Sequence, residues 1–264
     1  MKAKPRFFLQ ACLILTAGLY SGGCTSAGLN AYRGKPFQDS VYHGGPQKIP
    51  GRVQCAYYDC GGEGVAYHNK DTKNHGSGEL NPANGTYLNE FRMKEGVSTS
   101  YTKFHSETAI DNNPYNLVQP AEGQLYVGWT SPGEWFNMTV EVEHTGVYAI
   151  DLLYTSNRGG AISLDLNGRP LVSTINVIST STDKDPIAWR QWHHWNVMTN
   201  IAEVELPKGV SVLTFHIVTE GNMNLACLDF KPKHKKPSGD EKNGSAASIS
   251  DSQTRGLAAI YTSF

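Results

Sequence analysis

Apolar residues occur at every second position in several segments between residues 136 and 217. In the clearest of them, Phe136, Met138, Val140 and Val142 alternate with polar residues. Successive side chains of a β-strand point to opposite faces of the sheet, so this alternation predicts a strand with one buried face. The region has no convincing amphipathic helix, and the same alternation is present in 148–154, 162–166, 204–206 and 213–217. The pattern predicts an all-β fold, a jelly-roll-like β-sandwich of short antiparallel strands.

Turns that contain glycine separate these predicted strands. They are Thr145-Gly146, Asn167-Gly168 and Pro207-Lys208-Gly209. Asn-Gly favours the two-residue type I′ turn, so a hairpin is expected at Asn167-Gly168. The stretch 69–119 is different, because it is polar and rich in Asn and Gly. We expect long loops around one or two strands there, and long ordered loops often bind ligands.

Composition divides the chain into four parts. Residues 1–23 combine a basic start with an apolar run that is short for a bilayer span, which is typical of a secretory signal peptide. Residues 24–49 have Gly and Pro throughout and are interpreted as a linker. The β pattern lies in 50–232. Residues 233–264 are rich in Lys, Ser, Gly and Asp without periodic apolar residues, which predicts a disordered polar tail.

The segment Ser21-Gly22-Gly23-Cys24 resembles a bacterial lipobox, in which the cysteine is lipidated and becomes the new N-terminus. Ser21 departs from that pattern, because an aliphatic residue is usual there. Because the rest of the segment matches the pattern, we expect an exported protein that a lipid on Cys24 anchors to the membrane. It would be a lipoprotein of the cell envelope or outer surface. A secreted protein without a lipid and a protein with a retained membrane anchor are the alternatives.

Positive and negative charges nearly balance. The chain has 23 Lys and Arg against 24 Asp and Glu, a formal net charge of -1. Nucleic-acid-binding domains present a basic face, so this balance gives no support for a nucleic-acid partner. Of the five cysteines, Cys12 lies in the predicted signal peptide and Cys24 in the lipobox. The other three allow at most one intramolecular disulfide.

Three tryptophans lie within seven residues, at positions 189, 192 and 195. In a strand, Trp189 and Trp195 would share one face and Trp192 would point to the other. We interpret Trp192 as a core residue and Trp189 as an exposed indole, a flat apolar surface that suits a sugar ring. The alternation alone does not indicate a role for Trp195. The adjacent His193-His194 lacks a third ligand at metal spacing, so no metal site is expected there.

Five motifs occur in order along the predicted sandwich. They are Ile49-Pro50-Gly51-Arg52-Val53, the loop 61–68, Phe91-Arg92 followed by 95–97, the segment 127–135, and Asn222-Met223-Asn224-Leu225. Each motif alone is weakly specific, but together they resemble family 6 carbohydrate-binding modules, which are non-catalytic β-sandwich sugar binders. The resemblance covers the predicted domain from end to end.

The resemblance implies a sugar site in the loops at one edge of the sandwich. Phe91 and Trp189 match an aromatic pair, Asn224 matches an amide, and Glu63 matches an acidic residue that bonds a sugar hydroxyl. Two rings can stack on the apolar faces of a pyranose, while the amide and carboxylate bond its hydroxyls.

Other roles are open for some of these residues. Phe91 lacks the hydroxyl of the usual tyrosine and could point inward. Asn224 could instead cap a turn. Trp129 and Trp135, within the fourth motif, are interpreted as core or strand-packing residues.

The resemblance would also imply a structural calcium on the first and last strands. Gln54, Ala56 and Ala226 occupy its acidic positions. Calcium is held by several hard oxygen ligands, carboxylates foremost, so neither calcium nor another metal or cofactor is predicted.

The same two strands would place Cys55 and Cys227 on one sheet face, where a disulfide could join them. Buried free thiols, or a pairing with Cys60, are the alternatives.

These features predict non-catalytic binding of a poly- or oligosaccharide at the bacterial surface or outside the cell, close to glycan-degrading enzymes. One alternative is a glycan-acting hydrolase or an accessory fragment of one, although no hydrolytic motif accompanies the module. A structural or adhesive sandwich without a sugar site is the third hypothesis.

Overall fold

The structure is a computed structural model that describes residues 31–105 and 109–233. The predicted signal peptide, Cys24 and residues 234–264 lie outside the described part. Within it, none of the helices is long and apolar enough to cross a bilayer. The elements in chain order are β1 (Gln47–Ile49), β2 (Gly51–Gln54), η1 (Cys55–Tyr57), β3 (Tyr67–His68), β4 (Ser77–Gly78), β5 (Asn81–Pro82), α2 (Tyr87–Glu90), β6 (Thr99–Tyr101), β7 (Leu125–Val127), β8 (Trp135–Val142), β9 (Gly146–Ser156), β10 (Gly160–Leu166), β11 (Arg169–Val177), η2 (Ala188–Trp192), β12 (Asn196–Leu206), β13 (Gly209–Thr219) and β14 (Met223–Pro232).

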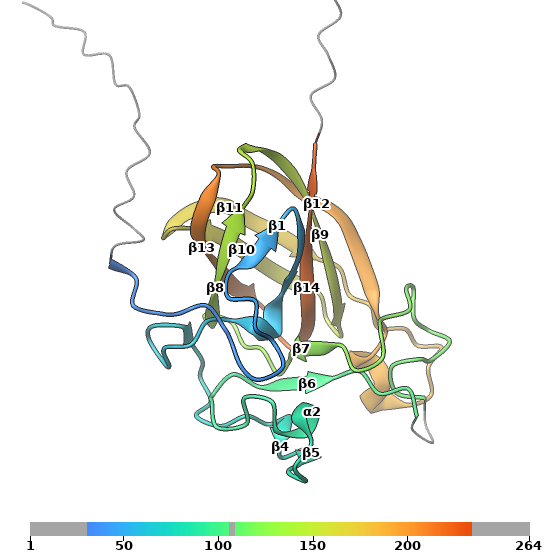
Figure 1. Cartoon of the computed structure of the whole chain (residues 1–264). Helices are drawn as coiled ribbons and strands as arrows, with labels where there is room; N and C mark the ends of the chain where they lie inside the picture. The colour runs from blue at the N-terminus through green and yellow to red at the C-terminus, as the bar shows by residue number, and fades with distance from the viewer. Residues whose placement is uncertain (1–30, 106–108, 234–264) are drawn as a thin grey trace, which may run out of the picture. The chain divides into compact units, whose positions relative to one another are not determined.

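Two six-stranded sheets form the domain (Figure 1). One has the order β1-β8-β13-β10-β11, with β3 beside β8, and the other has the order β12-β9-β14-β7-β6, with β2 beside β14. Within these sheets only β1 and β8 pair in parallel. The two layers with an apolar core between them make a β-sandwich, so the predicted fold class is confirmed.

The alternating segments of the sequence form the long strands of both sheets. Residues 136–142 lie in β8, 148–154 in β9 and 213–217 in β13. The predicted hairpin is also present, because Asn167-Gly168 joins β10 to β11 with φ angles of 52° and 71°. Positive φ at both central residues is what the type I′ turn requires.

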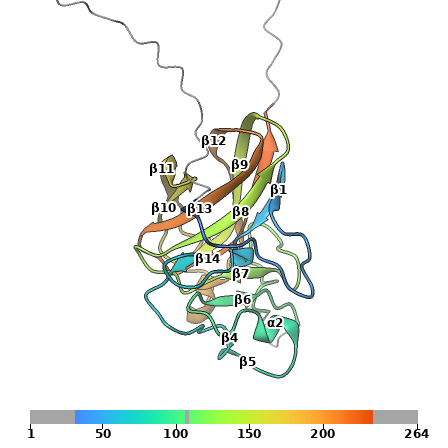
Figure 2. The same ribbon diagram turned by 60° about the vertical axis from the view of Figure 1, so that its left-hand side comes forward.

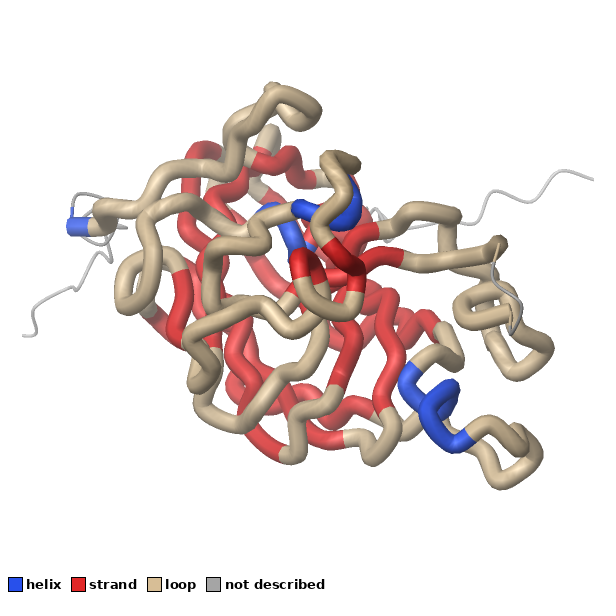
Figure 3. The backbone as a smooth tube through the Cα atoms, turned by 90° about the horizontal axis from the view of Figure 1, so that it is seen from below, coloured by secondary structure: helices blue, strands red, loops and turns tan. Residues whose placement is uncertain are grey.

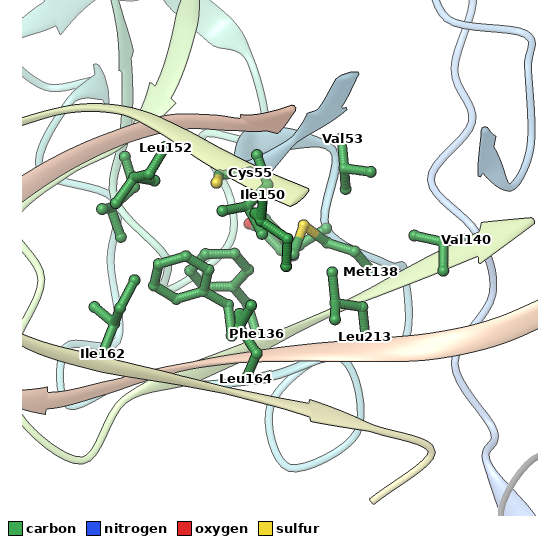
Figure 4. Packing of buried hydrophobic residues seen from close by; sticks show 14 of the residues in the cluster. Val53, Cys55, Phe136, Met138, Val140, Ile150, Leu152, Ile162, Leu164 and Leu213 are labelled. Carbon is green, nitrogen blue, oxygen red and sulfur yellow. The ribbon is translucent and has the colours of Figure 1, made fainter. Parts of the chain in front are cut away.

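The core consists of inward-facing side chains from both sheets (Figure 4). Met138 and Leu164 on one sheet and Ile150 on the other are fully buried in the same cluster. Phe136 and Phe215 stack with their ring centroids 5.1 Å apart. Burial of an aliphatic or aromatic side chain of this size contributes about 1.5–3 kcal/mol. The core therefore holds the strands firmly and gives the loops between them fixed starting points.

Residues 35–49, which the composition assigned to the linker, are part of the folded domain. The backbone of Lys35 pairs with that of Cys60, Phe37 is buried, and β1 joins the first sheet beside β8. Local composition did not indicate these contacts, because each is made with a residue much further along the chain. The linker interpretation is corrected for this segment.

The stretch 69–119 forms loops around the short elements β4, β5, α2 and β6, as expected (Figure 2). Its main anchor is the buried side chain of Asn74. The Oδ1 atom of Asn74 accepts hydrogen bonds from the backbone N–H groups of Gly76, Ser77 and Thr99 at 2.9–3.0 Å. Its Nδ2 donates to Oγ1 of Thr99 at 2.8 Å. These bonds give the loop a defined conformation without regular secondary structure.

Cys55, Cys60 and Cys227 are free thiols, so the disulfide that the resemblance implied is wrong. A β-bulge after Leu225 changes the alternation of β14. As a result Cys227 joins a cluster on the outer face of its sheet, whereas Cys55 lies in the core between the sheets. Burial raises the pKa of the Cys227 thiol to about 12, so it stays protonated at neutral pH.

Candidate functional site

A pocket of about 410 Å³ lies among loops that come from four parts of the chain. Loops and short helical turns gather at the end of the sandwich that Figure 3 shows from below. The pocket surface is mostly apolar, with a few polar side chains, as is common in small-ligand sites. The lining residues are Leu80, Tyr126, Trp129, Trp189, Trp192, His193, Asn222 and Asn224.

Trp189 lies on the short helix η2, and 46% of its surface is exposed. The residues that follow it fix the helix to the preceding loop. Arg190 donates from Nε to Oδ2 of Asp185 at 2.7 Å and from a terminal nitrogen to Oδ1 at 2.8 Å. The Oε1 atom of Gln191 accepts the backbone N–H of Thr182 at 2.8 Å, and its Nε2 donates to the backbone carbonyl oxygen of Thr182 at 2.8 Å. An exposed indole on so firmly held a turn is available to a ligand at little entropic cost.

Asp185 is the centre of this support. It is buried together with Arg190 and His194, and His194 Nε2 lies 2.8 Å from the same carboxylate oxygen that Arg190 contacts. The hydrogen bonds from Arg190 hold the pKa of the Asp185 carboxyl well below its ordinary value of 3.8. The carboxylate therefore remains ionised at neutral pH and pairs with the guanidinium of Arg190.

Asn224 lies at the start of β14, and it links two walls of the pocket. Its Nδ2 donates to the carbonyl oxygen of Trp192 at 2.6 Å, and Thr155 Oγ1 donates to the same oxygen at 2.6 Å. Asn224 is thus a pocket residue, as the resemblance implied, and it also holds the aromatic segment in place. The side chain is largely buried, so only part of its amide is available to a ligand.

Trp129 is one of the aromatic residues whose position differs from the expectation. Instead of packing in the core, it lines the pocket with 37% of its surface exposed. Its backbone has a φ of 51°, a conformation that costs a bulky residue about 1–3 kcal/mol and that recurs at binding sites. Thr130 fixes the turn by accepting hydrogen bonds from the backbone N–H groups of Asn222 and Met223 at 2.7 and 3.0 Å.

Phe91 does not reach the pocket. It is only 3% exposed and packs against Phe37, Tyr57 and Tyr87, with ring centroids 5.5–6.0 Å apart. The interpretation of Phe91 as a sugar-stacking ring is therefore wrong, and the inward alternative holds. A phenylalanine has no polar group that would keep the ring edge near water, so burial in an aromatic cluster is favoured.

Glu63 also lies apart from the lining residues. Its Oε1 is 2.5 Å from Nδ1 of His68, and its Oε2 accepts the backbone N–H of Asn69 at 3.0 Å. These bonds organise the loop that precedes β3. The structure therefore brings Trp189 and Asn224 together, and it leaves Glu63 and Phe91 elsewhere.

The strand alternation assumed for residues 189–195 does not apply, because this segment is a 3-10 helix followed by three residues without regular structure. Trp192 is only half-buried and lines the pocket rather than filling the core. Trp195 is fully buried instead, and its Nε1 donates to Oδ1 of Asp111 at 2.7 Å. His193 Nδ1 lies 2.9 Å from the same Asp111 oxygen. The loop around Asp111 thus supports the pocket from behind.

The positions matched to a family calcium site have other partners here. Gln54 Oε1 accepts a hydrogen bond from Gln124 at 2.7 Å, and Ala56 and Ala226 are buried among apolar residues. In residues 31–105 and 109–233, no three His, Cys, Asp or Glu side chains are grouped so that they could hold a metal ion.

A substitution at Gly128 is expected to disturb Asn224 specifically. A Cβ atom at this position would lie 2.8 Å from Oδ1 of Asn224, which forces the amide to shift. We expect Gly128→Ala to lower the free energy of unfolding by about 1–3 kcal/mol, the usual cost of overpacking, and to weaken ligand binding. Thermal unfolding and titration check this. Gly146→Ala is the matched control, since its nearest side-chain atom is 4.0 Å away, and equal behaviour of the two variants would contradict the expectation.

No family model and no curated protein matches the sequence. Among solved structures, the chain resembles a β-1,3-glucan-binding family 6 carbohydrate-binding module from Bacillus halodurans, with 16% identity, coverage of 70% of this chain and 98% of that chain, and a TM-score of 0.42. A family 6 module from Clostridium stercorarium in complex with cellobiose has 13% identity, coverage of 72% and 99%, and a TM-score of 0.41. A module of Cellvibrio mixtus lichenase 5A in complex with cellotriose has 22% identity, coverage of 42% and 80%, and a TM-score of 0.35. At these identities and scores the likeness carries no inference about the ligand of this chain.

Proposed function

We propose that the chain binds a neutral poly- or oligosaccharide in this pocket without cleaving it. The observation that carries the proposal is the grouping of Trp129, Trp189 and Trp192 with the amides of Asn222 and Asn224. Indoles stack on the C–H faces of a pyranose ring, and amides both donate to and accept from its hydroxyls.

Charge favours a neutral sugar over an acidic one. No lining residue is Lys, Arg, Asp or Glu, and His193 is already bonded to Asp111. A uronate or sulfate group would lose water in this apolar pocket without gaining a cationic partner, which is costly. Hydroxyl groups lose less, because the amides replace part of their hydration.

The pocket supports binding better than hydrolysis. Glycosidases place two carboxylates on either side of the scissile bond. The pocket lining contains none, and Glu63 and Glu134 are engaged with backbone N–H groups of neighbouring loops. A purely structural sandwich would not need two exposed indoles on one pocket. We therefore propose that the protein retains a glycan and does not cleave it.

The proposed setting is outside the cell. The signal-like segment 1–23 and the lipobox-like Cys24 support export and a lipid anchor at the cell envelope. From there the domain would hold a polysaccharide near the cell and near enzymes that degrade it. Labelling with a radioactive fatty acid tests the anchor, because Cys24→Ala should remove the label.

Affinity electrophoresis tests the ligand class. We expect slower migration in native gels that contain at least one of hydroxyethylcellulose, xylan and mixed-linkage β-glucan, and unchanged migration with polygalacturonate. Retardation by polygalacturonate alone, or by none of the polymers, would contradict the proposal. Release of reducing sugar from the same polymers would instead support the hydrolase.

A further inference from the structure

Among the lining residues, Leu80 alone comes from the loop stretch 69–119. It lies in the turn between β4 and β5, with 61% of its surface exposed. An exposed leucine is unremarkable by itself, but Leu80 forms one side of a pocket whose other sides are indoles and amides. Leu117 is 71% exposed and lies outside the pocket, which makes it a natural comparison.

The turn that carries Leu80 is firmly held. Besides the bonds of Asn74, the hydroxyl of Ser77 donates to the carbonyl oxygen of Thr99 at 3.1 Å. On the other side of Leu80, Nδ2 of Asn81 donates to Oγ of Ser100 at 3.0 Å. Both anchors are buried side chains bonded to β6. Leu80 is therefore presented in a fixed position rather than on a freely moving loop.

The same loop supports Trp129 directly. A Cβ atom at Gly76 would lie 3.0 Å from Cζ3 of Trp129 and 2.0 Å from the carbonyl oxygen of Thr99. The backbone of Gly76 is thus packed against the indole, and no larger residue fits there without displacing backbone. One side of Trp129 is occupied by this loop, which limits the orientations open to the ring.

We propose that residues 74–82 form a wall of the binding pocket, in which Leu80 contacts bound saccharide and Gly76 holds Trp129 in position. This inference rests on the proposed function. Leu80 meets a part of the ligand that the indoles do not cover, and it offers that part only an apolar contact. Asn222 also lines the pocket and is exposed. Its side-chain amide has no hydrogen-bond partner among the described side-chain contacts, so it can bond a hydroxyl of the ligand.

Titration calorimetry of Leu80→Ala tests the proposal, with cellohexaose, xylohexaose and laminarihexaose as probes and Leu117→Ala as the matched control. For each hexaose that wild type binds, we expect Leu80→Ala to bind about fourfold more weakly, the effect of losing contact area equal to about one buried methylene group. Leu80→Asp should bind at least about tenfold more weakly, because it places a charge beside the apolar pocket. Leu117→Ala should stay within about twofold of wild type, and the melting temperatures of all variants should agree with that of wild type.

The outcomes separate this proposal from the one on which it rests. If wild type binds a hexaose and Leu80→Ala has the same affinity as Leu117→Ala, residues 74–82 do not form a wall of the binding site. The proposed function of the pocket is then unaffected. A loss of affinity that accompanies a clear fall in melting temperature would show that Leu80 stabilises the fold. That result would also contradict a direct contact between Leu80 and the saccharide. If wild type binds none of the hexaoses and none of the polysaccharides, both proposals fail together.

Discussion

Trp189→Ala is expected to abolish measurable retention of the protein by the polysaccharide that wild type binds. The indole is a large exposed ring on the pocket, and loss of a tryptophan at a binding hot spot costs about 2 kcal/mol or more, roughly thirtyfold in affinity. The melting temperature should hardly change, because nearly half of the surface of Trp189 is already exposed to solvent. Affinity electrophoresis and thermal unfolding of the same samples check both expectations.

Trp135→Ala is the matched control for this experiment. Trp135 is a partly exposed tryptophan on β8, its ring lies near His68, and it does not line the pocket. This variant should keep the wild-type retention, even if its stability falls slightly. Undiminished retention of Trp189→Ala, or an equal loss in the two variants, would mean that Trp189 is not the stacking surface.

Asp185→Asn is expected to give the largest loss of stability. The substitution keeps the shape of the side chain but leaves the buried guanidinium of Arg190 without its counter-charge. Removal of one partner from a buried ion pair costs about 3–5 kcal/mol. For a domain of this size that lowers the melting temperature by roughly 6–20 °C. Glycan affinity should fall as well, because the pair supports the helix that carries Trp189.

The chain contains a matched exposed pair for comparison. Arg52 donates to both carboxylate oxygens of Asp229 at 3.0 and 3.1 Å, in the same two-bond geometry, but both side chains are partly exposed. Asp229→Asn should cost no more than about 1 kcal/mol. The double variant Asp185→Asn with Arg190→Met should recover part of the stability that Asp185→Asn loses, since no unpaired charge stays buried. Equal losses in the two single variants would contradict a special role for Asp185.

The contribution of Asp185 has a definite pH dependence. Because the folded-state pKa lies below the ordinary value of 3.8, the stabilisation is complete at pH values above 3.8 and is lost as the pH falls toward the folded-state pKa. The wild-type protein should therefore lose stability more steeply below about pH 4 than Asp185→Asn does. This difference is visible in acid-unfolding curves.

Local alternation in the sequence was sufficient to predict the sandwich. The period of two depends only on neighbouring residues, and it marked β8, β9, β10 and β13 because the positions of each strand that face the core are apolar. The hairpin at Asn167-Gly168 followed from the φ preference of those two residues. The strand β1 could not be found in this way, since its three residues are too few to show an alternating pattern.

The site was predicted only in part, and the errors share a cause. Trp189 and Asn224 were identified, but Trp129 was assigned to the core because its left-handed backbone, which turns the ring to the pocket, has no signature in residue spacing. Alternation failed for Trp192 and Trp195 where the chain becomes a 3-10 helix, and for Cys227 where a bulge adds one residue. Such local departures from regular structure decide which face a side chain occupies, and they depend on tertiary contacts.

A crystal structure of the protein with a bound oligosaccharide from the hexaose panel tests the central claim most directly. We expect a pyranose ring stacked on the indole of Trp189, with a hydroxyl within hydrogen-bond distance of Asn222 or Asn224 and with Trp129 also in contact. Saccharide bound elsewhere, such as beside Glu63 or Trp135, with the pocket free of sugar, would contradict it.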